Sequence, residues 1–302
     1  MGYSADARGH DAVNLAVSLA RGRGAVLELV LVVPEVSQFG AAHAPKAGFE
    51  NLLNEQARQW IDEALALVPD DVPAKAHIRS GDSEALALIE ASEELQAEML
   101  IIGATSSGLF KRFTVGSVAS ALLHAATVPV ALAPHGYHHT EALTRLSCGL
   151  GSRTGAGKLL GFAAGMATER KVPLRVVSLL SLDGGDSLKA AEAAREHAVK
   201  IIAAARPGSA DQDASGPEVV VAQGRSIEEA VDHLDWQDGE VLLIGSSRLA
   251  RYRSIFLGST ANRILRALPV PMIVVPSNYE ATPAPGGSTH SMSNETSGKT
   301  QK

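Results

Sequence analysis

The sequence predicts two α/β domains in tandem, each a doubly wound, Rossmann-like parallel sheet covered by helices. Three observations predict this fold class. A pattern of glycines, a serine and prolines occurs twice in one register, short apolar runs alternate with helical stretches, and the length of 302 residues suits two domains of ordinary size.

The repeat keeps residues that shape the backbone at one constant spacing. Gly103, Gly116, Ser117, Val128, Pro129 and Pro134 recur, in the same order and without a gap, as Gly245, Gly258, Ser259, Val270, Pro271 and Pro276. An uninterrupted match over a stretch this long indicates a duplicated domain. Function is therefore to be sought in what both copies keep.

Apolar runs that are short, nearly continuous and partly β-branched are typical of strands covered on both faces. In the first copy these predicted strands are residues 27–33, 99–102 and 128–133, and helical spacing predicts helices over residues 11–19, 52–67 and 83–95. The second copy repeats the order, with strands predicted at residues 146–150, 174–180, 218–221, 241–244 and 271–275. Strict alternation of this kind builds a parallel sheet with right-handed crossovers.

The first copy lacks most of its first strand. The second copy begins with a predicted strand at residues 145–150, whereas only residues 1–4 precede the corresponding helix of the first copy. Two explanations stay open: the chain continues upstream of residue 1, or the first domain folds with a stub. We favour the first, because a missing inner strand leaves two sheet edges without backbone partners.

The domain boundaries follow from composition. Residues 135–144 interrupt both periodicities, and the chain after residue 278 is polar and poor in large apolar side chains. We therefore predict a first domain over residues 1–138, a second over residues 139–278, and a disordered tail over residues 279–302.

Charge and cysteine content exclude several classes of protein. A net charge of -6 offers no positive surplus for nucleic acid or anionic lipid, so neither is expected as a partner. The single Cys148 excludes an internal disulfide framework and a cysteine-based zinc cluster. No apolar run is long enough to span a bilayer and no secretion signal is visible, so we expect a cytoplasmic protein.

Both glycine loops follow a predicted strand and lead into a predicted helix. In open parallel sheets, ligands bind beyond the carboxyl ends of the strands. A helix that starts with glycine and serine offers free amide donors and a positive dipole end, which suit a phosphate, and glycine lets the backbone approach the ligand closely. The alternative is structural: the glycines turn the chain and the serine caps the helix.

This pattern resembles the universal stress protein family, over the whole chain except the tail. The resemblance implies an adenine nucleotide alpha hydrolase-like fold that holds ATP with a motif of glycine, two residues, glycine, nine residues, glycine, and serine or threonine. The two repeated triplets match it, but the middle glycine is Ser106 in the first copy and Arg248 in the second. The family's acidic residue after the first strand falls on Ser4 and Gly151.

The resemblance gives a set of candidate nucleotide-binding residues, in which Val32 and Leu179 occupy the position that lines the base pocket. The set is Ser4, Val32, Gly103, Thr105, Ser106, Gly116, Ser117, Val118, Gly151, Leu179, Gly245, Ser247, Arg248, Gly258, Ser259 and Thr260. Arg248 either pairs with a phosphate or blocks the pocket. Lys111 and Arg253 occupy equivalent loop positions and either reach phosphates or lie solvated on the surface.

The leading hypothesis is a stress-response regulatory protein that binds ATP, with or without Mg²⁺, in one or both domains and acts through protein partners. The main alternative is an interaction module of the same fold that binds no nucleotide. A dinucleotide-binding protein is a third hypothesis, suggested by Gly149, Gly151 and Gly155, although Asp183 lies too far along the chain for the expected acidic contact.

No pairing of a nucleophile with a base recurs in both copies, so we expect no dedicated catalytic site and at most slow ATP hydrolysis. His135, His138 and His139 in the linker are expected to be solvated and not to bind a metal. The resemblance further implies that the last strands of the two copies pair across a pseudo-twofold axis, so that the tandem mimics a dimer.

Overall fold

The computed structural model describes residues 1–35, 46–106, 113–114, 116–151, 155–181, 187–205, 216–246, 258–277 and 279. The helices are α1 (Ala7–Ala20), α2 (Lys46–Ala66), α3 (Glu84–Glu94), α4 (Ser117–Ala125), α5 (Ala156–Arg170), α6 (Ser187–Ala205), α7 (Ile227–Asp232) and α8 (Ser259–Ala267). The strands are β1 (Gly2–Tyr3), β2 (Leu27–Val33), β3 (Ala74–Ser80), β4 (Leu100–Gly103), β5 (Thr105–Ser106), β6 (Phe113–Thr114), β7 (Val130–Ala133), β8 (Arg145–Gly149), β9 (Leu174–Ser181), β10 (Glu218–Gly224), β11 (Glu240–Gly245) and β12 (Met272–Val275).

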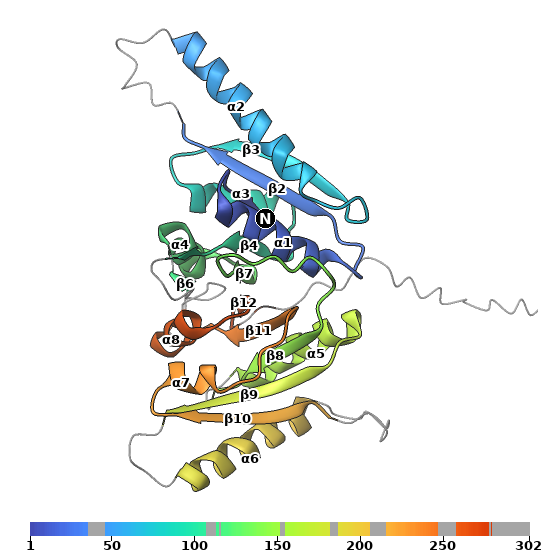
Figure 1. Cartoon of the computed structure of the whole chain (residues 1–302), viewed down its shortest axis with the longest axis vertical. Coiled ribbons are helices and arrows are strands. Elements are labelled where there is room, and N and C mark those ends of the chain that lie inside the picture. The colour runs from blue at the N-terminus through green and yellow to red at the C-terminus, as the bar shows by residue number, and fades with distance from the viewer. Residues whose placement is uncertain are drawn as a thin grey trace, which may run out of the picture.

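The strands form one long sheet, one short sheet and a small hairpin. The long sheet has the order β10-β9-β8-β11-β12-β7-β4, the short sheet the order β1-β2-β3, and β5 pairs with β6. Within the first two sheets every pair is parallel except β12 with β7. Figure 1 shows the two halves stacked end to end, with β7 and β12 in the middle and α2 and α6 at the far ends. The predicted tandem of doubly wound α/β domains is confirmed.

Most of the first strand of the first half is missing, as predicted. β1 spans two residues and pairs only with Val30 and Leu31 of β2, whereas β8 spans five residues and pairs on both sides, with β9 and with β11. A Cβ atom built on Gly2 would stand 3.2 Å from a side-chain atom of Ile102, so β1 lies against β4 without a hydrogen-bonded ladder between them. The sheet of the first half is therefore split where the second half is continuous.

The two halves are joined by their last strands. β7 and β12 pair antiparallel, with Leu132 opposite Met272 and Val130 opposite Val274, which confirms the expected pairing across a pseudo-twofold axis. One buried apolar layer combines residues of α1, β7, α5 and β12, and the other combines residues of α3, α4, α8 and β12. Since both layers run through the joint, the halves share their core and form an intramolecular pseudo-dimer.

One strand lacked the pattern that predicts strands in this sequence. β3 alternates small or apolar residues with Lys75, His77 and Arg79, so it contains no apolar run. Among the described strands it pairs only with β2. The Glu28 carboxylate of β2 lies 2.6 Å from His77 Nε2 and 3.6 Å from Lys75 Nζ. Because this edge strand carries polar or charged side chains at every second position, a search for apolar runs does not predict it.

The chain after β12 stays packed for a few residues. Tyr279 stacks edge-to-face on Phe162 of α5, with ring centroids 5.6 Å apart, and its hydroxyl donates to the backbone oxygen of Glu98 in the first half at 3.2 Å. The predicted tail therefore starts with a residue that belongs to the folded unit, and residues 280–302 lie outside the described ranges. In the described part of the chain, no helix combines the length and apolar character needed to cross a bilayer.

Candidate functional site

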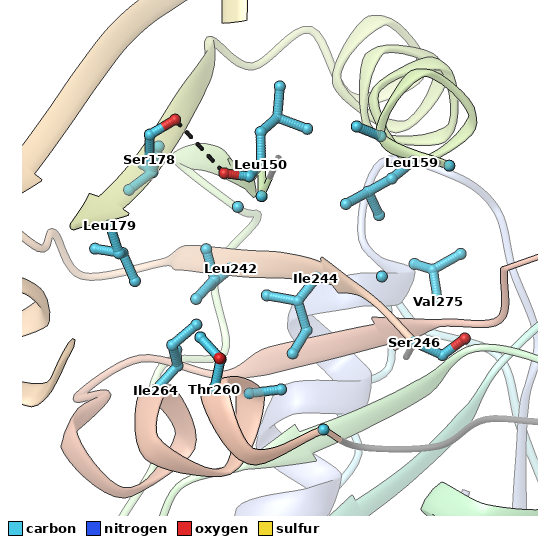
Figure 2. Close-up of a pocket in the computed structure, with 18 of the residues that line it drawn as sticks. Leu150, Leu159, Ser178, Leu179, Leu242, Ile244, Ser246, Thr260, Ile264 and Val275 are labelled. Carbon is cyan, nitrogen blue, oxygen red and sulfur yellow. Dashed lines mark hydrogen bonds between the residues drawn. The ribbon is translucent and has the colours of Figure 1, made fainter. Parts of the chain in front are cut away.

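A pocket of about 710 Å³ opens at the carboxyl ends of the second half's strands. β8 has β9 on one side and β11 on the other, so the strand order reverses here, which is where ligands bind in open α/β sheets. α5 and α6 wall the pocket on one face of the sheet, and α7 and α8 on the other. Figure 2 shows β9, β11 and β12 together with α5 and α8 around this space.

Glycines at the strand ends keep this pocket open. Gly149, Gly151, Gly155 and Gly245 all line it. A Cβ atom on Gly151 would meet nothing within 4 Å, and one on Gly245 would have Leu159 as its nearest neighbour, at 3.8 Å. Among the described residues, a Cβ atom on Gly245 would therefore make only an ordinary van der Waals contact, and no atom would have to move.

The start of α8 faces the same space. Gly258 is the N-cap residue in an extended conformation, its cap lacks a side-chain hydrogen bond, and both Gly258 and Thr260 line the pocket. The first-turn amides of a helix lack partners within the helix and carry the positive end of its dipole. They are donors in place for an anion.

A clamp between helices fixes α8. The single Nε–H of Arg263 in α8 is shared between the two carboxylate oxygens of Glu228 in α7, each at 3.0 Å, and Nη2 donates to Glu228 at 2.8 Å. Hydrogen bonding from Arg263 lowers the pKa of Glu228 to about 2, so the pair is ionised at neutral pH. This ion pair joins the middle of α8 to α7.

The pocket wall is mainly apolar and carries no acidic side chain among its described lining residues. Leu159, Leu179, Ile244 and Ile264 are grouped around the common space in Figure 2, and Lys158 of α5 also lines it. Ser178 donates to the backbone oxygen of Leu150 at 3.5 Å. An apolar cavity with a helix start and a lysine suits a ligand with one flat apolar part and one anionic part.

The corresponding place in the first half is filled by the protein itself. A Cβ atom on Gly103 would stand 2.1 Å from the backbone oxygen of Arg8, at the start of α1. The turn from β1 to α1 is short: the backbone oxygen of Ser4 accepts from the amide of Asp6 at 2.8 Å, and Asp6 is the N-cap of α1. This tight turn places the first turn of α1 on the carboxyl end of β4.

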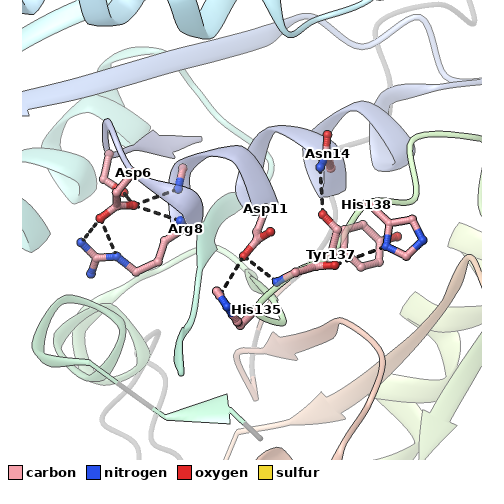
Figure 3. A network of polar contacts seen from close by, with 10 residues as sticks. Asp6, Arg8, Asp11, Asn14, His135, Tyr137 and His138 are labelled. Atoms are coloured by element: carbon pink, nitrogen blue, oxygen red, sulfur yellow. Dashed lines mark hydrogen bonds and ion pairs between the residues drawn. The ribbon is translucent and has the colours of Figure 1, made fainter. Parts of the chain in front are cut away.

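Polar contacts hold α1 in that place (Figure 3). Asp6 accepts from the amides of Arg8 and Gly9 at 3.0 and 3.3 Å and from the Arg8 guanidinium at 2.6 Å. Partial burial raises the pKa of Asp6, but hydrogen bonds from Arg8, Ser4 and Gly9 outweigh it and bring the pKa to about 2. The Asp6 carboxylate that caps α1 is therefore ionised throughout the physiological pH range.

Further along α1, the helix is bound to the chain that follows β7. The amide of Gly136 donates to Asp11 at 3.0 Å, and Asn14 donates to the backbone oxygen of Tyr137 at 2.8 Å (Figure 3). Burial raises the pKa of Asp11. His135 lies 3.7 Å from the same carboxylate. α1 is thus fixed at both its first turn and its middle.

The structure brings the candidate residues together in two unequal groups. In the second half, Gly151, Leu179, Gly245, Gly258 and Thr260 all line the pocket, and Ser259 lies exposed between the last two. Ser247 and Arg248 lie outside the described residues, as do Lys111 and Arg253 of the loops. Arg248 as a phosphate partner or as a block therefore stays a prediction.

In the first half, the glycines also meet, but around a filled space. Gly103 ends β4, Gly116 is the N-cap of α4, and a Cβ on Gly116 would stand 3.3 Å from the Thr105 side chain. The remaining candidates of this half have separate places: Ser4 donates to Asp6, Val32 packs in the core, Ser106 pairs with Phe113, and Ser117 and Val118 start α4. The helix cap proposed for Ser117 is wrong, because Gly116 occupies the N-cap position and no side chain caps α4.

Sequence reasoning missed several lining residues. His197 on α6 and Tyr279 after β12 line the pocket without belonging to the repeated motif. Lys158 lies shortly after Gly155, one of the glycines that suggested the dinucleotide hypothesis, and this proximity is the signal that could have placed it. For the three linker histidines, the described residues contain no group of three or more His, Cys, Asp or Glu side chains that could hold a metal ion.

Comparison with known proteins identifies relatives over nearly the whole chain. The model of the universal stress protein family matches twice, at residues 2–134 and 144–276. Universal stress proteins of Mycobacterium bovis and Mycobacterium tuberculosis are each 31% identical over 294 residues, covering 91% of this chain and 98% of theirs. The crystal structure of a universal stress protein from Archaeoglobus fulgidus aligns with a TM-score of 0.61 at 18% identity, covering 88% of this chain and 94% of that one. That structure supports the fold.

Proposed function

Because the chain belongs to the universal stress protein family, which supports a role in stress response, we propose that it binds one adenine nucleotide, in its second half. The observation that carries the proposal is the contrast between equivalent glycines. Gly245 borders an open pocket of about 710 Å³, whereas Gly103 is covered by the backbone of Arg8.

The pocket has the size and chemistry for such a ligand. Its volume lies within the roughly 300–1,000 Å³ range of small-molecule sites. The phosphates would lie against the first turn of α8, at Gly258 and Thr260, where amide donors and the helix dipole favour negative charge. The base would lie across the strand ends from α8, against the apolar wall at Leu179 of β9.

The described lining fits Mg²⁺ only through the ligand. No aspartate or glutamate lines the pocket, so a cation would be held by phosphate oxygens and water, which is common for Mg²⁺. The same lack of carboxylates leaves little local repulsion against a triphosphate. We propose binding and regulation through protein partners, with hydrolysis no more than slow.

A matched pair of substitutions tests the proposal. Ser259 and Ser117 are equivalent, exposed, and the first residues of α8 and α4. Glutamate is well tolerated in a first helical turn, so Ser259→Glu and Ser117→Glu should both fold. By isothermal titration with ATP and Mg²⁺, Ser259→Glu should weaken binding at least tenfold, because it adds a negative charge to the first turn of α8, between the pocket residues Gly258 and Thr260. Ser117→Glu should leave binding unchanged.

Three results would count against the proposal. An absence of heat with the parent protein would favour an interaction module that binds no nucleotide. Equal losses in both variants would mean that the two halves are not distinct as sites. Binding of NADH in place of ATP would favour the dinucleotide hypothesis, since Gly149, Gly151 and Gly155 lie on the same wall.

A further inference from the structure

α6 turns a stripe of small residues and one histidine toward the pocket. Ala190, Ala193, Ala194 and His197 line it, at the spacing that places residues on one face of a helix. Alanines leave room between α6 and β9, so the pocket extends from the start of α8 across the strand ends to α6. His197 is the polar group of this stripe.

The His197 side chain has an unused ring nitrogen. Its Nε2 atom is hidden from solvent and has no hydrogen-bond partner among the described residues. A buried polar atom without a hydrogen-bond partner is unfavourable, because it has lost its bonds to water. Other polar groups of the wall differ: Ser178 donates to Leu150, and Ser246 accepts from the amide of Ser277 at 3.0 Å. Since Nε2 is hidden from solvent, a ligand group reaches it only when the ring turns toward the pocket, and it then gains a hydrogen bond without breaking one.

The position of α6 decides which end of the ligand His197 meets. α6 packs in the buried layer that contains α5, and α8 packs in the layer on the opposite face of the sheet. A nucleotide whose phosphates lie at α8 therefore crosses the strand ends and presents its base toward β9 and α6. At the position of the family's acidic residue, this half has Gly151, which offers no side chain to the base.

We infer that His197 recognises the base of the nucleotide bound in the second half, by a hydrogen bond from the base to its ring nitrogen. The inference rests on the proposed function and adds the source of base selectivity. A neutral imidazole nitrogen acts as a donor or an acceptor according to its tautomer, so it can pair with the polar edge of a purine. A site that hydrogen-bonds its ligand discriminates strongly against analogues that cannot make the bond.

The test compares ATP with purine riboside triphosphate, which keeps the purine ring but lacks the 6-amino group that donates the bond. Both are titrated by calorimetry into the parent protein, His197→Phe and His197→Gln. Phenylalanine keeps an aromatic ring and removes the nitrogens, and glutamine restores hydrogen-bonding capacity. We expect the parent to prefer ATP, His197→Phe to weaken ATP at least tenfold and lose most of the preference, and His197→Gln to recover part of both. His233→Phe is the control, because that histidine is exposed and bonds to the Gln223 backbone, away from the pocket.

The outcomes separate this inference from the proposed function. A parent protein that binds ATP with no preference over purine riboside triphosphate overturns the role of His197 alone. So does a His197→Phe variant that binds ATP as tightly as the parent does. A variant whose affinities for ATP and for purine riboside triphosphate fall by the same factor also overturns it, because that result indicates a structural role. A parent that binds no nucleotide overturns the proposed function and this inference with it.

Discussion

A single added methyl group at equivalent glycines should have opposite consequences in the two halves. In Gly103→Ala, the new Cβ would stand 2.1 Å from the Arg8 oxygen and 2.9 Å from the Arg8 Cα. Ordinary contact starts at 3.4 Å, so the start of α1 would have to move by more than about 1 Å. In Gly245→Ala, the nearest atom is 3.8 Å away and nothing has to move.

The magnitude follows from these distances. Overpacking against backbone costs typically about 1–3 kcal/mol, and a substitution with no clash stays within about 0.5 kcal/mol. Alanine is favoured over glycine in a strand by roughly 0.5–1 kcal/mol, but this gain applies to both variants and cancels in their comparison. We expect Gly103→Ala to be less stable than Gly245→Ala by about 1–3 kcal/mol.

Hydrogen exchange followed by mass spectrometry measures this difference where it arises. Hydrogen exchange reports the free energy of local opening at each amide, so it does not depend on the whole chain unfolding in a single two-state transition. In Gly103→Ala, amides of residues 7–20 should exchange faster than in the parent, and in Gly245→Ala they should not. Equal protection of α1 in both variants would refute the claim that the Arg8 backbone fills the first site.

Three further predictions concern other parts of the structure. Glu240→Ala should lower the free energy of unfolding by denaturant by about 3–5 kcal/mol, because it removes a fully buried carboxylate that pairs with two arginines. The equivalent Glu98 is exposed, so Glu98→Ala should lower it by less than about 1 kcal/mol, and similar losses in the two variants would contradict this account. By NMR, the Glu228 carboxyl should have a pKa near 2 in the parent protein and a pKa closer to 4.5 in Arg263→Met. Its contribution to stability is therefore present above about pH 4.5 and is lost as the pH falls toward 2. An unshifted pKa in the parent protein would contradict the ion pair with Arg263. Burial raises the pKa of Cys148 to about 12, so a thiol reagent at pH 8 should label it only after unfolding, and fast labelling of the native protein would mean that β8 is not in the core.

Much of the fold could be predicted because the buried strands have a simple pattern. β2 lies at the predicted residues, and β9 and β12 differ by one residue at one end, since an inner parallel strand is apolar along its length. β3 could not be found this way, because its charged side chains pair with those of its neighbour or face solvent. The shortness of β1 could be predicted from the sequence, but its consequence could not. Only the structure shows that the first turn of α1 lies against Gly103.

In the second half, the sequence predicted the residues of the repeated motif but not the other residues that line the pocket. The repeated glycines and the residues beside them mark where a strand ends and a helix starts, and both halves carry them equally. What distinguishes the halves is the length of the turn after the first strand and the side chains that α6 turns inward. Those features depend on how elements distant in sequence pack together, so the motif alone predicts two equivalent sites.

The number of nucleotides that one chain holds tests the central claim most directly. Native mass spectrometry of the protein saturated with ATP and Mg²⁺ should show one nucleotide per chain, lost with Ser259→Glu and kept with Ser117→Glu. Two nucleotides per chain, or a single one that is lost with Ser117→Glu, would contradict a filled first site and an open second one.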